Sequence, residues 1–213
     1  MPDADPTPQA DPRAVTEPAA PVRKRPKPGE RRVQILQALA TMLEQPGAER
    51  ITTAALAARL EVSEAALYRH FASKAQMFEG LIEFIEQSVF TLVNQIQERQ
   101  AGEPVRQAAA IATLLVQFAE RNPGMTRVMV GDALVFENER LQQRMNQFFD
   151  RIESTLKQCL RADGEGSTTP TVDAQVRASL LTAFVVGRLQ RFARSGFKRL
   201  PSEHLEDSLA RIL

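Results

Sequence analysis

The sequence predicts an all-α protein, and three observations support this. After Gly29, apolar residues recur at steps of three and four along most of the chain, which is the period of an amphipathic helix. Capping residues, prolines and glycines separate these stretches from one another. No stretch shows the strict alternation of a half-buried strand. We therefore expect a small N-terminal domain of three helices followed by a larger C-terminal helical domain.

The first 28 residues are predicted to be a disordered tail. Eight of the thirteen prolines lie there, with almost no large apolar residue between them. Such a segment cannot bury enough surface to offset the entropy of ordering it. The end of the tail and the residues that follow are basic: Arg23, Lys24, Arg25, Lys27, Arg31 and Arg32. This basic segment is compatible with two interpretations, a solubilising linker or an arm that reaches phosphates or a minor groove.

Residues 29–73 are predicted to form the three-helix domain. The first helix begins after Gly29 and stops at Pro46-Gly47. Its expected inner face consists of Val33, Leu36, Leu39, Ala40 and Leu43. A second, short helix is capped by Thr52 and Thr53 and reaches Leu60. Its expected inner residues are Ala55, Leu56 and Leu60. Ser63 caps a third short helix that ends near Phe71.

Residues 74–213 are predicted to form the larger domain. Its first helix opens at the capping box that begins with Ser73 and reaches about Gln100, a length of roughly 40 Å at 1.5 Å per residue. Further helices are expected at Pro104–Arg121, about Met125–Val130, Glu137–Arg161, Pro170 to about Ser195, and from Pro201 or Ser202 onward. Thr169 is expected to cap the long helix at Pro170, and residues 162–169 are expected to form a loop.

Composition excludes several classes of function. The net charge is +1, so a nucleic-acid interaction has to rest on where the charges lie. The single cysteine, Cys159, rules out an internal disulfide, and His70 and His204 have no partner at metal-ligand spacing. No catalytic constellation or cofactor fingerprint is present, so we expect neither an enzyme nor a bound cofactor. The acidic, proline-rich start lacks the apolar segment of a signal peptide, and no apolar run approaches the roughly 18 residues of a membrane span, which predicts a cytoplasmic protein.

Residues 52–71 have the pattern of a helix-turn-helix. On the third helix, Leu67 and Phe71 are expected to point inward, while the opposite face presents the small Ala65 beside Arg69. A helix without bulky residues on its approach side fits the major groove of DNA. The alternative is an ordinary helical hairpin whose polar face meets water. Glu61 stands in the tight turn, where a residue with positive φ other than glycine costs roughly 1 kcal/mol.

Three stretches carry a resemblance to a known family. The run VSEAALYRHFASKAQMF resembles the DNA-binding segment of the TetR family of dimeric bacterial regulators. Residues 65–86, 120–153 and 180–198 are similar to the nucleoid occlusion factors within that family. The similarity extends from about residue 30 to the C-terminus.

The resemblance implies a function and two sets of site residues. Nucleoid occlusion factors bind palindromic chromosomal sites and, when bound to DNA, bind the C-terminal tail of the division protein FtsZ and block assembly of the division ring over the nucleoid. The implied DNA contacts are Thr52, Thr53, Ser63, Ala65, Tyr68, Arg69, His70 and Lys74. The implied residues of the FtsZ-tail groove, between the fourth and fifth helices, are Phe84, Leu114, Arg121 and Asn122.

The residues are compatible with such a groove, because two apolar walls and an arginine suit a peptide with apolar anchors and acidic groups. The residues alone favour the alternative, with Phe84 and Leu114 in the core and Arg121 in solvent at a helix end, and the resemblance reverses this preference. The wide apolar band of the helix from Pro170 predicts a homodimer. In this dimer, that helix and the helix 137–161 of each subunit would together form an intersubunit four-helix bundle. The expected interface residues are Leu180, Phe184, Leu189 and Phe192; burial of that helix within one subunit is the alternative.

A ligand-responsive repressor of the same fold is the rival function. A large apolar cavity would favour the repressor, and an exposed groove at Phe84 and Arg121 would favour FtsZ binding.

Overall fold

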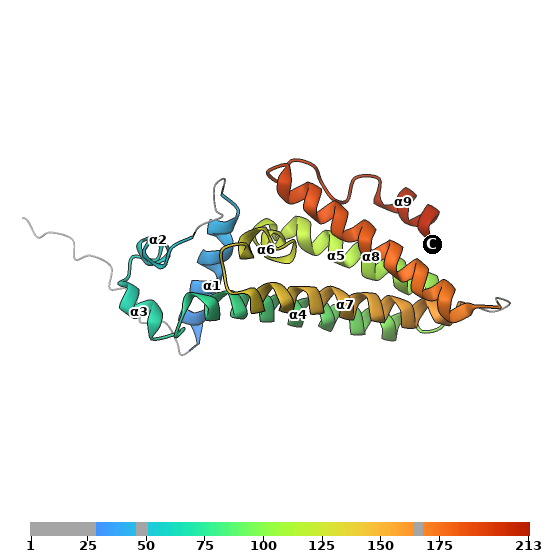
Figure 1. Ribbon diagram of the computed structural model, residues 1–213, viewed down its shortest axis with the longest axis horizontal. Coiled ribbons are helices and arrows are strands. Elements are labelled where there is room, and N and C mark those ends of the chain that lie inside the picture. Colours follow the sequence, from blue (N-terminus) through green and yellow to red (C-terminus); the bar gives the residue numbers. More distant parts are fainter. Residues whose placement is uncertain (1–28, 46–50, 164–167) are drawn as a thin grey trace, which may run out of the picture.

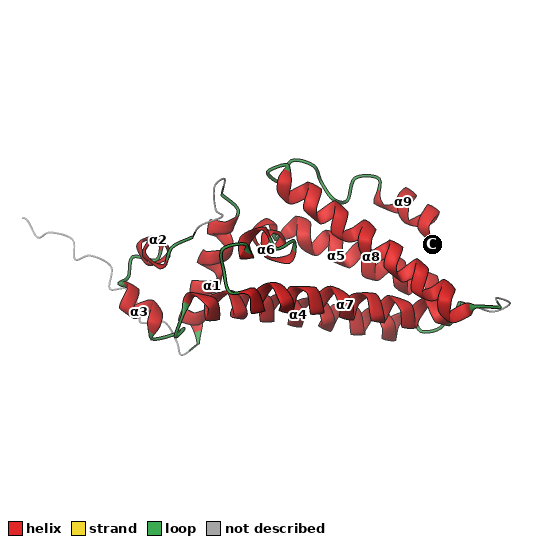
Figure 2. Cartoon of the chain, viewed as in Figure 1, coloured by secondary structure: helices red, strands yellow, loops and turns green. Residues whose placement is uncertain are grey.

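The computed structural model describes residues 29–45, 51–163 and 168–213, and within these ranges its regular elements are all helical (Figure 2). The all-α prediction is therefore confirmed. The elements are α1 (Glu30–Leu43), α2 (Thr53–Arg59), α3 (Glu64–Tyr68), α4 (Lys74–Arg99), α5 (Pro104–Arg121), α6 (Pro123–Met129), the 3₁₀ helix η2 (Asp132–Leu134), α7 (Glu139–Arg161), α8 (Pro170–Arg194) and α9 (Leu205–Ile212). The predicted tail, with Arg23 to Lys27, and the stop at Pro46-Gly47 lie outside the described residues.

The short helices α1 to α3 lie at one end of the long helices α4, α5, α7 and α8 (Figure 1). The helix α4 contributes to both regions, because it packs on α1 as well as on α5 and α7. Its cap is close to the predicted one: Ser73 Oγ accepts the amide of Gln76, while Gln76 Oε1 accepts the amide of Ala72, one residue before Ser73. The division of the chain after residue 73 stays a prediction.

The core runs the length of the long helices. The helix α5 lies at its centre, in contact with α4, α6, α7 and α8, and its Ile111 and Leu115 are at most 1% exposed. Arg144 of α7 donates two hydrogen bonds, of 3.0 and 2.6 Å, to the carboxylate of Glu86 in α4. This bidentate ion pair links the two helices.

Two predicted inner residues face solvent instead. Val33 is 53% exposed, and Ile35 takes its place in the core with Leu39 and Leu43. Two steps of about 100° separate Val33 from Ile35, so these side chains lie on opposite sides of α1. In α2, Ala55 is exposed and Ala57 is buried.

Several helix ends differ from the prediction. The helix α6 starts at Pro123, because a proline suits the first position of a helix. The helix α7 starts at Glu139, two residues after the predicted start at Glu137, and Asn138 caps it by accepting the amide of Arg140 at 3.0 Å. Thr169 does not cap α8 with its side chain, and its hydroxyl donates to Asp173 instead. The last helix starts only at Leu205, after the left-handed His204.

The contact between α6 and α1 is unusually close. A Cβ atom at Gly124 would lie 1.9 Å from the carbonyl oxygen of Ala40 in α1. Only a residue without a side chain allows this approach, so Gly124 sets the distance between α1 and α6.

Candidate functional site

The α2–turn–α3 unit has the geometry of a helix-turn-helix. Leu67 and Phe71 are each 1% exposed, as predicted for the inner face. Thr52 and Ser63 cap the two helices by accepting the amides of Ala55 and Ala66 at 3.1 and 3.3 Å. Their acceptor positions are thus used internally, while their hydroxyl hydrogens remain able to meet an acceptor outside the protein.

The turn between the helices is a Schellman motif built without glycine. The amide of Val62 donates to the carbonyl of Ala57, and that of Glu61 donates to the carbonyl of Ala58. Glu61 has a φ of 53°, the left-handed conformation that its place in the turn predicts. The motif satisfies the last carbonyls of α2 and fixes the angle at which α3 leaves it.

The outer face of α3 carries the predicted DNA contacts. Ala65, Tyr68 and Arg69 are exposed, and His70 follows them at the surface. The carbonyl of His70 accepts a hydrogen bond of 3.0 Å from Arg32, whose guanidinium lies 4.1 Å from the ring centre of Phe71. Arg32 thus packs on this face and stabilises it, and it does not extend into solvent as part of the basic arm.

An acidic residue that the sequence analysis did not single out lies within this face. Thr53 Oγ1 donates to Glu64 Oε2 at 2.5 Å, and the hydroxyl of Tyr68 donates to Thr53 Oγ1 at 3.4 Å. Glu64 also stabilises the positive N-terminal end of α3. The three side chains link α2 to α3 and orient the Tyr68 ring, so a phosphate that takes the Tyr68 hydroxyl competes with Thr53.

Lys74, at the first position of α4, is held by an ion pair. Its Nζ donates to Glu137, which lies between η2 and α7 and has a side chain only 9% exposed. Because the Lys74 ammonium has three donors, it can meet a phosphate either beside this carboxylate or in its place.

We predict that Lys74→Ala flattens the salt dependence of DNA affinity, whereas Tyr68→Ala lowers affinity without changing the slope. Each cationic phosphate contact contributes about 0.9 to the slope of log affinity against log salt, so a dimer should lose about 1.8. Tyr68 is neutral and displaces no counterion. Fluorescence anisotropy with duplex DNA at several salt concentrations measures both quantities.

The double variant Lys74→Ala/Glu137→Gln serves as the control, because it leaves no unpaired carboxylate. The free energy of unfolding of the double variant should equal that of the wild type. Its slope of log DNA affinity against log salt should remain as flat as that of Lys74→Ala. An unaltered slope in both Lys74 variants would remove Lys74 from the phosphate contacts.

The predicted partner-binding residues lie along the antiparallel pair α4 and α5. Phe84 is 48% exposed, which excludes the alternative that it is a core residue, and Leu114 is half-buried. Arg121 is exposed in the last turn of α5. The side-chain amide of Asn122 donates to the carbonyl of Phe118 at 2.7 Å, so this residue has a structural role as the cap of α5.

A surface hollow of about 350 Å³ lies between the same two helices. Its lining includes Leu114 but also residues that the sequence analysis did not assign: Leu92, Gln95, Ile96, Arg99, Gln100, Ala110, Thr113 and Gln117. Leu92 is 40% exposed. Of the four predicted partner-binding residues, Leu114 alone lines this hollow, which reaches from there to Arg99.

The exposed apolar surface of α8 differs in part from the prediction. Val172, Val176 and Leu180, spaced by one turn, are 59, 52 and 57% exposed. We call these three residues the α8 stripe. Phe184, one turn further, is half-buried. Leu189 and Phe192 are at most 2% exposed within the single chain, so their assignment to a subunit interface is wrong.

The helical period explains this correction. Leu189 lies on the same side of α8 as the buried Leu181 and Val185, which is the side that faces α7 and α5. The helix α7 contributes no large exposed apolar residue, so its predicted place in the dimer bundle has no apolar surface to support it.

Groups of three or more potential metal-binding side chains do not occur in the described part of the chain. Burial raises the pKa of the Cys159 thiol, which disfavours the reactive thiolate. Across residues 29–45, 51–163 and 168–213, none of the helices is both long and apolar enough to cross a bilayer.

Two family models match the chain. Residues 35–81 match the N-terminal domain of bacterial regulatory proteins of the TetR family, and residues 104–212 match a tetracyclin repressor-like, SlmA-like C-terminal domain. Among curated proteins, the nucleoid occlusion factor SlmA of Idiomarina loihiensis is 55% identical over 82% of this chain and 89% of its own length. The protein of the same name from Vibrio cholerae is 53% identical over 83% of this chain and 91% of its own.

Solved structures share the fold at low identity. A TetR-family transcriptional regulator from Bordetella parapertussis superposes with a TM-score of 0.67 at 16% identity, over 87% of this chain and 95% of that one. AibR, solved with isovaleryl coenzyme A and operator DNA, gives 0.66 at 17% identity, over 85% and 97%.

Proposed function

Because the chain belongs to the TetR family of bacterial regulatory proteins, and within it to the SlmA nucleoid occlusion factors, we propose that it couples two binding events. As a homodimer it binds palindromic DNA on the chromosome. In that state it binds the C-terminal tail of FtsZ and prevents a division ring from assembling over the nucleoid. This proposal places the protein in the cytoplasm, on the nucleoid.

The exposed face of α3 supports the DNA-binding half. Its small Ala65 allows close approach to base edges, and Arg69 can donate two hydrogen bonds to a guanine. Around it, Thr52, Ser63 and Tyr68 present hydroxyl donors that suit backbone phosphates, which position the helix. The buried Leu67 and Phe71 hold α3 on the domain, so the reading face is presented by a rigid element.

The α8 stripe supports the homodimer. Three large apolar side chains, each more than half exposed and one turn apart, form a continuous ridge that a second copy of the same helix can cover. A two-fold dimer also presents two α3 helices, which can read a palindrome when they lie about one DNA turn, roughly 34 Å, apart.

We predict that Leu180→Asp converts the dimer to a monomer, because the change buries a carboxylate within the proposed interface without a partner. Sedimentation velocity at micromolar concentration measures the association state. Leu200→Asp is the control at a similarly exposed residue outside the α8 stripe and should remain dimeric. A dimeric Leu180→Asp variant would place the interface elsewhere.

The groove along α4 and α5 supports the FtsZ half. The observation that carries it is the combination, on one helix pair, of an apolar hollow lined by Leu92, Leu114 and the exposed Arg99 with a second exposed cation, Arg121, one helical turn after the lining residue Gln117. A short peptide with apolar anchors and acidic groups needs this pairing of an apolar cleft with guanidinium groups. Asn122 supports the groove by capping α5 rather than by direct contact.

The proposal is tested by anisotropy of a labelled FtsZ C-terminal peptide titrated with the full chain, with and without a palindromic duplex selected from random sequence. Saturable binding that tightens when DNA is present is the expected result. Binding of the duplex without binding of the peptide, in either condition, would reject the division-antagonist half and leave a DNA-binding repressor.

A further inference from the structure

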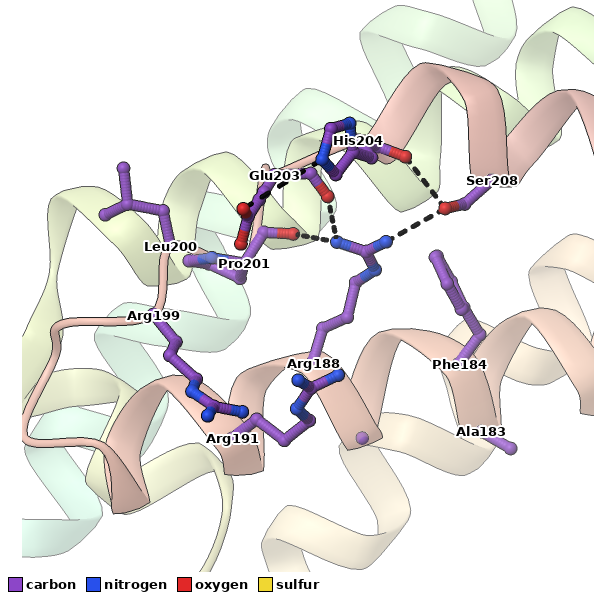
Figure 3. A pocket seen from close by; sticks show the side chains of 11 residues that line it. Ala183, Phe184, Arg188, Arg191, Arg199, Leu200, Pro201, Glu203, His204 and Ser208 are labelled. Carbon is purple, nitrogen blue, oxygen red and sulfur yellow. Dashed lines mark hydrogen bonds and ion pairs between the residues drawn. The ribbon is translucent and has the colours of Figure 1, made fainter.

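A second surface hollow, of about 610 Å³, lies between α8 and the segment that joins it to α9 (Figure 3). None of the residues assigned to DNA or to the FtsZ tail lines it. Three arginines do: Arg188 and Arg191 from α8, and Arg199 from the joining segment. We call this hollow the arginine pocket.

Arg188 builds the wall of the arginine pocket. Its guanidinium donates to the carbonyls of Pro201 and Glu203 at 2.9 and 2.6 Å and to the hydroxyl of Ser208 at 2.9 Å. It also lies 4.5 Å from the centre of the Phe184 ring. These contacts hold the joining segment and the start of α9 in place. The side of the pocket that faces α8 is therefore a fixed surface.

Arg191 and Arg199 have a different role. Both are exposed, and no hydrogen bond or ion pair engages either guanidinium within the described residues. In Figure 3 their side chains extend from two separate segments toward the same part of the pocket. Their guanidinium groups are therefore available to donate hydrogen bonds to a ligand from two sides.

The charge inside the pocket is unbalanced. Glu203 is the one carboxylate among its lining residues, against three guanidinium groups. Burial, together with the charge of Arg191, lowers the pKa of Arg188, and the Arg188 Nε is buried without a hydrogen-bond partner. The excess of guanidinium groups over carboxylates indicates positive charge that the lining residues do not neutralise.

We propose that the arginine pocket binds a phosphorylated small molecule. A phosphate group carries close to two negative charges and accepts bidentate hydrogen bonds from guanidinium groups, which suits Arg191 and Arg199. The volume exceeds that of a phosphate alone and falls in the range of ligand sites. Phe184 and the half-exposed Leu200 offer an apolar wall for the organic part of the ligand. The site adds a small-molecule input to the proposed DNA and FtsZ interactions and does not depend on them.

The test is isothermal titration calorimetry of inorganic pyrophosphate into the full chain, without DNA, in a low-salt buffer free of phosphate. One site per chain is expected. Arg191→Ala and Arg199→Ala should each weaken binding about tenfold or more, the usual effect of losing a charged hydrogen-bond donor. Arg188 is left unchanged in this test because its loss would release the joining segment.

Arg194→Ala is the matched control: Arg194 is also exposed on the last turn of α8, but it lies outside the arginine pocket. Its affinity should stay within about twofold of wild type. Absence of a saturable site, or equal losses in all three variants, would overturn the proposal. So would dissociation of the dimer by Arg191→Ala and Arg199→Ala in sedimentation, since these arginines would then serve the partner subunit.

Discussion

Gly124→Ala should be among the most destabilising single-methyl changes in this chain, lowering the free energy of unfolding by about 3 kcal/mol. The added Cβ would lie 1.9 Å from the carbonyl oxygen and 2.9 Å from the carbonyl carbon of Ala40. These are backbone atoms of α1 and cannot turn aside as the end of a side chain can. The helices α1 and α6 must therefore separate, and α1 carries the helix-turn-helix with it.

Thermal unfolding followed by circular dichroism measures this effect, with an expected fall in Tm of about 10 °C for a chain of this size. DNA affinity should fall as well, because the position of α1 relative to the long helices is disturbed.

Gly80→Ala is the matched control, since it also adds a methyl group within a helix that packs on α1. There the new Cβ would meet the Leu36 side-chain ends at 3.1 and 3.2 Å, which can shift, and the Phe71 ring at 3.4 Å, which is an ordinary contact. Alanine also favours the helix by about 1 kcal/mol. A near-neutral Gly80→Ala beside a strongly destabilised Gly124→Ala is expected. Equal stabilities of the two variants would show that the contact between α6 and α1 yields easily.

Arg121→Asp is expected to weaken binding of the FtsZ-tail peptide by about a hundredfold or more, because it replaces attraction to an acidic peptide by repulsion. DNA affinity should be unchanged, since Arg121 is exposed at the end of α5 and is not among the residues expected to contact DNA. Peptide anisotropy and DNA anisotropy on the same preparation provide the two readouts.

Arg194→Asp controls for the electrostatic cost of an acidic residue at a helix C-terminus, because Arg194 occupies the last turn of α8 as Arg121 occupies that of α5. It should bind the peptide like wild type. If Arg121→Asp lowers DNA affinity and peptide affinity together, the change is structural, and the assignment of Arg121 to the peptide-binding groove is rejected.

Local sequence was sufficient for the helices and for the reading face of the DNA-binding unit. The caps at Thr52, Ser63 and Ser73 and the inward Leu67 could be predicted, because caps and amphipathic faces depend on residues within one or two turns of each other. The strained turn at Glu61 was predictable for the same reason.

The sides of the long helices could not be assigned in this way. Leu180 and Leu189 belong to one wide apolar band in the sequence, but Leu180 faces outward and Leu189 is completely buried. A period of 3.6 residues shows that a helix has an apolar surface, and a wide band leaves open which part of it meets the same chain and which part a partner.

The sequence by itself determined the fold class, the helix-turn-helix and the family, all of which depend on short-range patterns. Only the tertiary structure decided that Lys74 pairs with Glu137, that Leu92 joins Leu114 in a hollow, and that Arg188, Arg191 and Arg199 line one pocket. These residues come from elements that meet only after the helices pack. Contacts between residues distant along the chain leave no periodic signal in a single sequence.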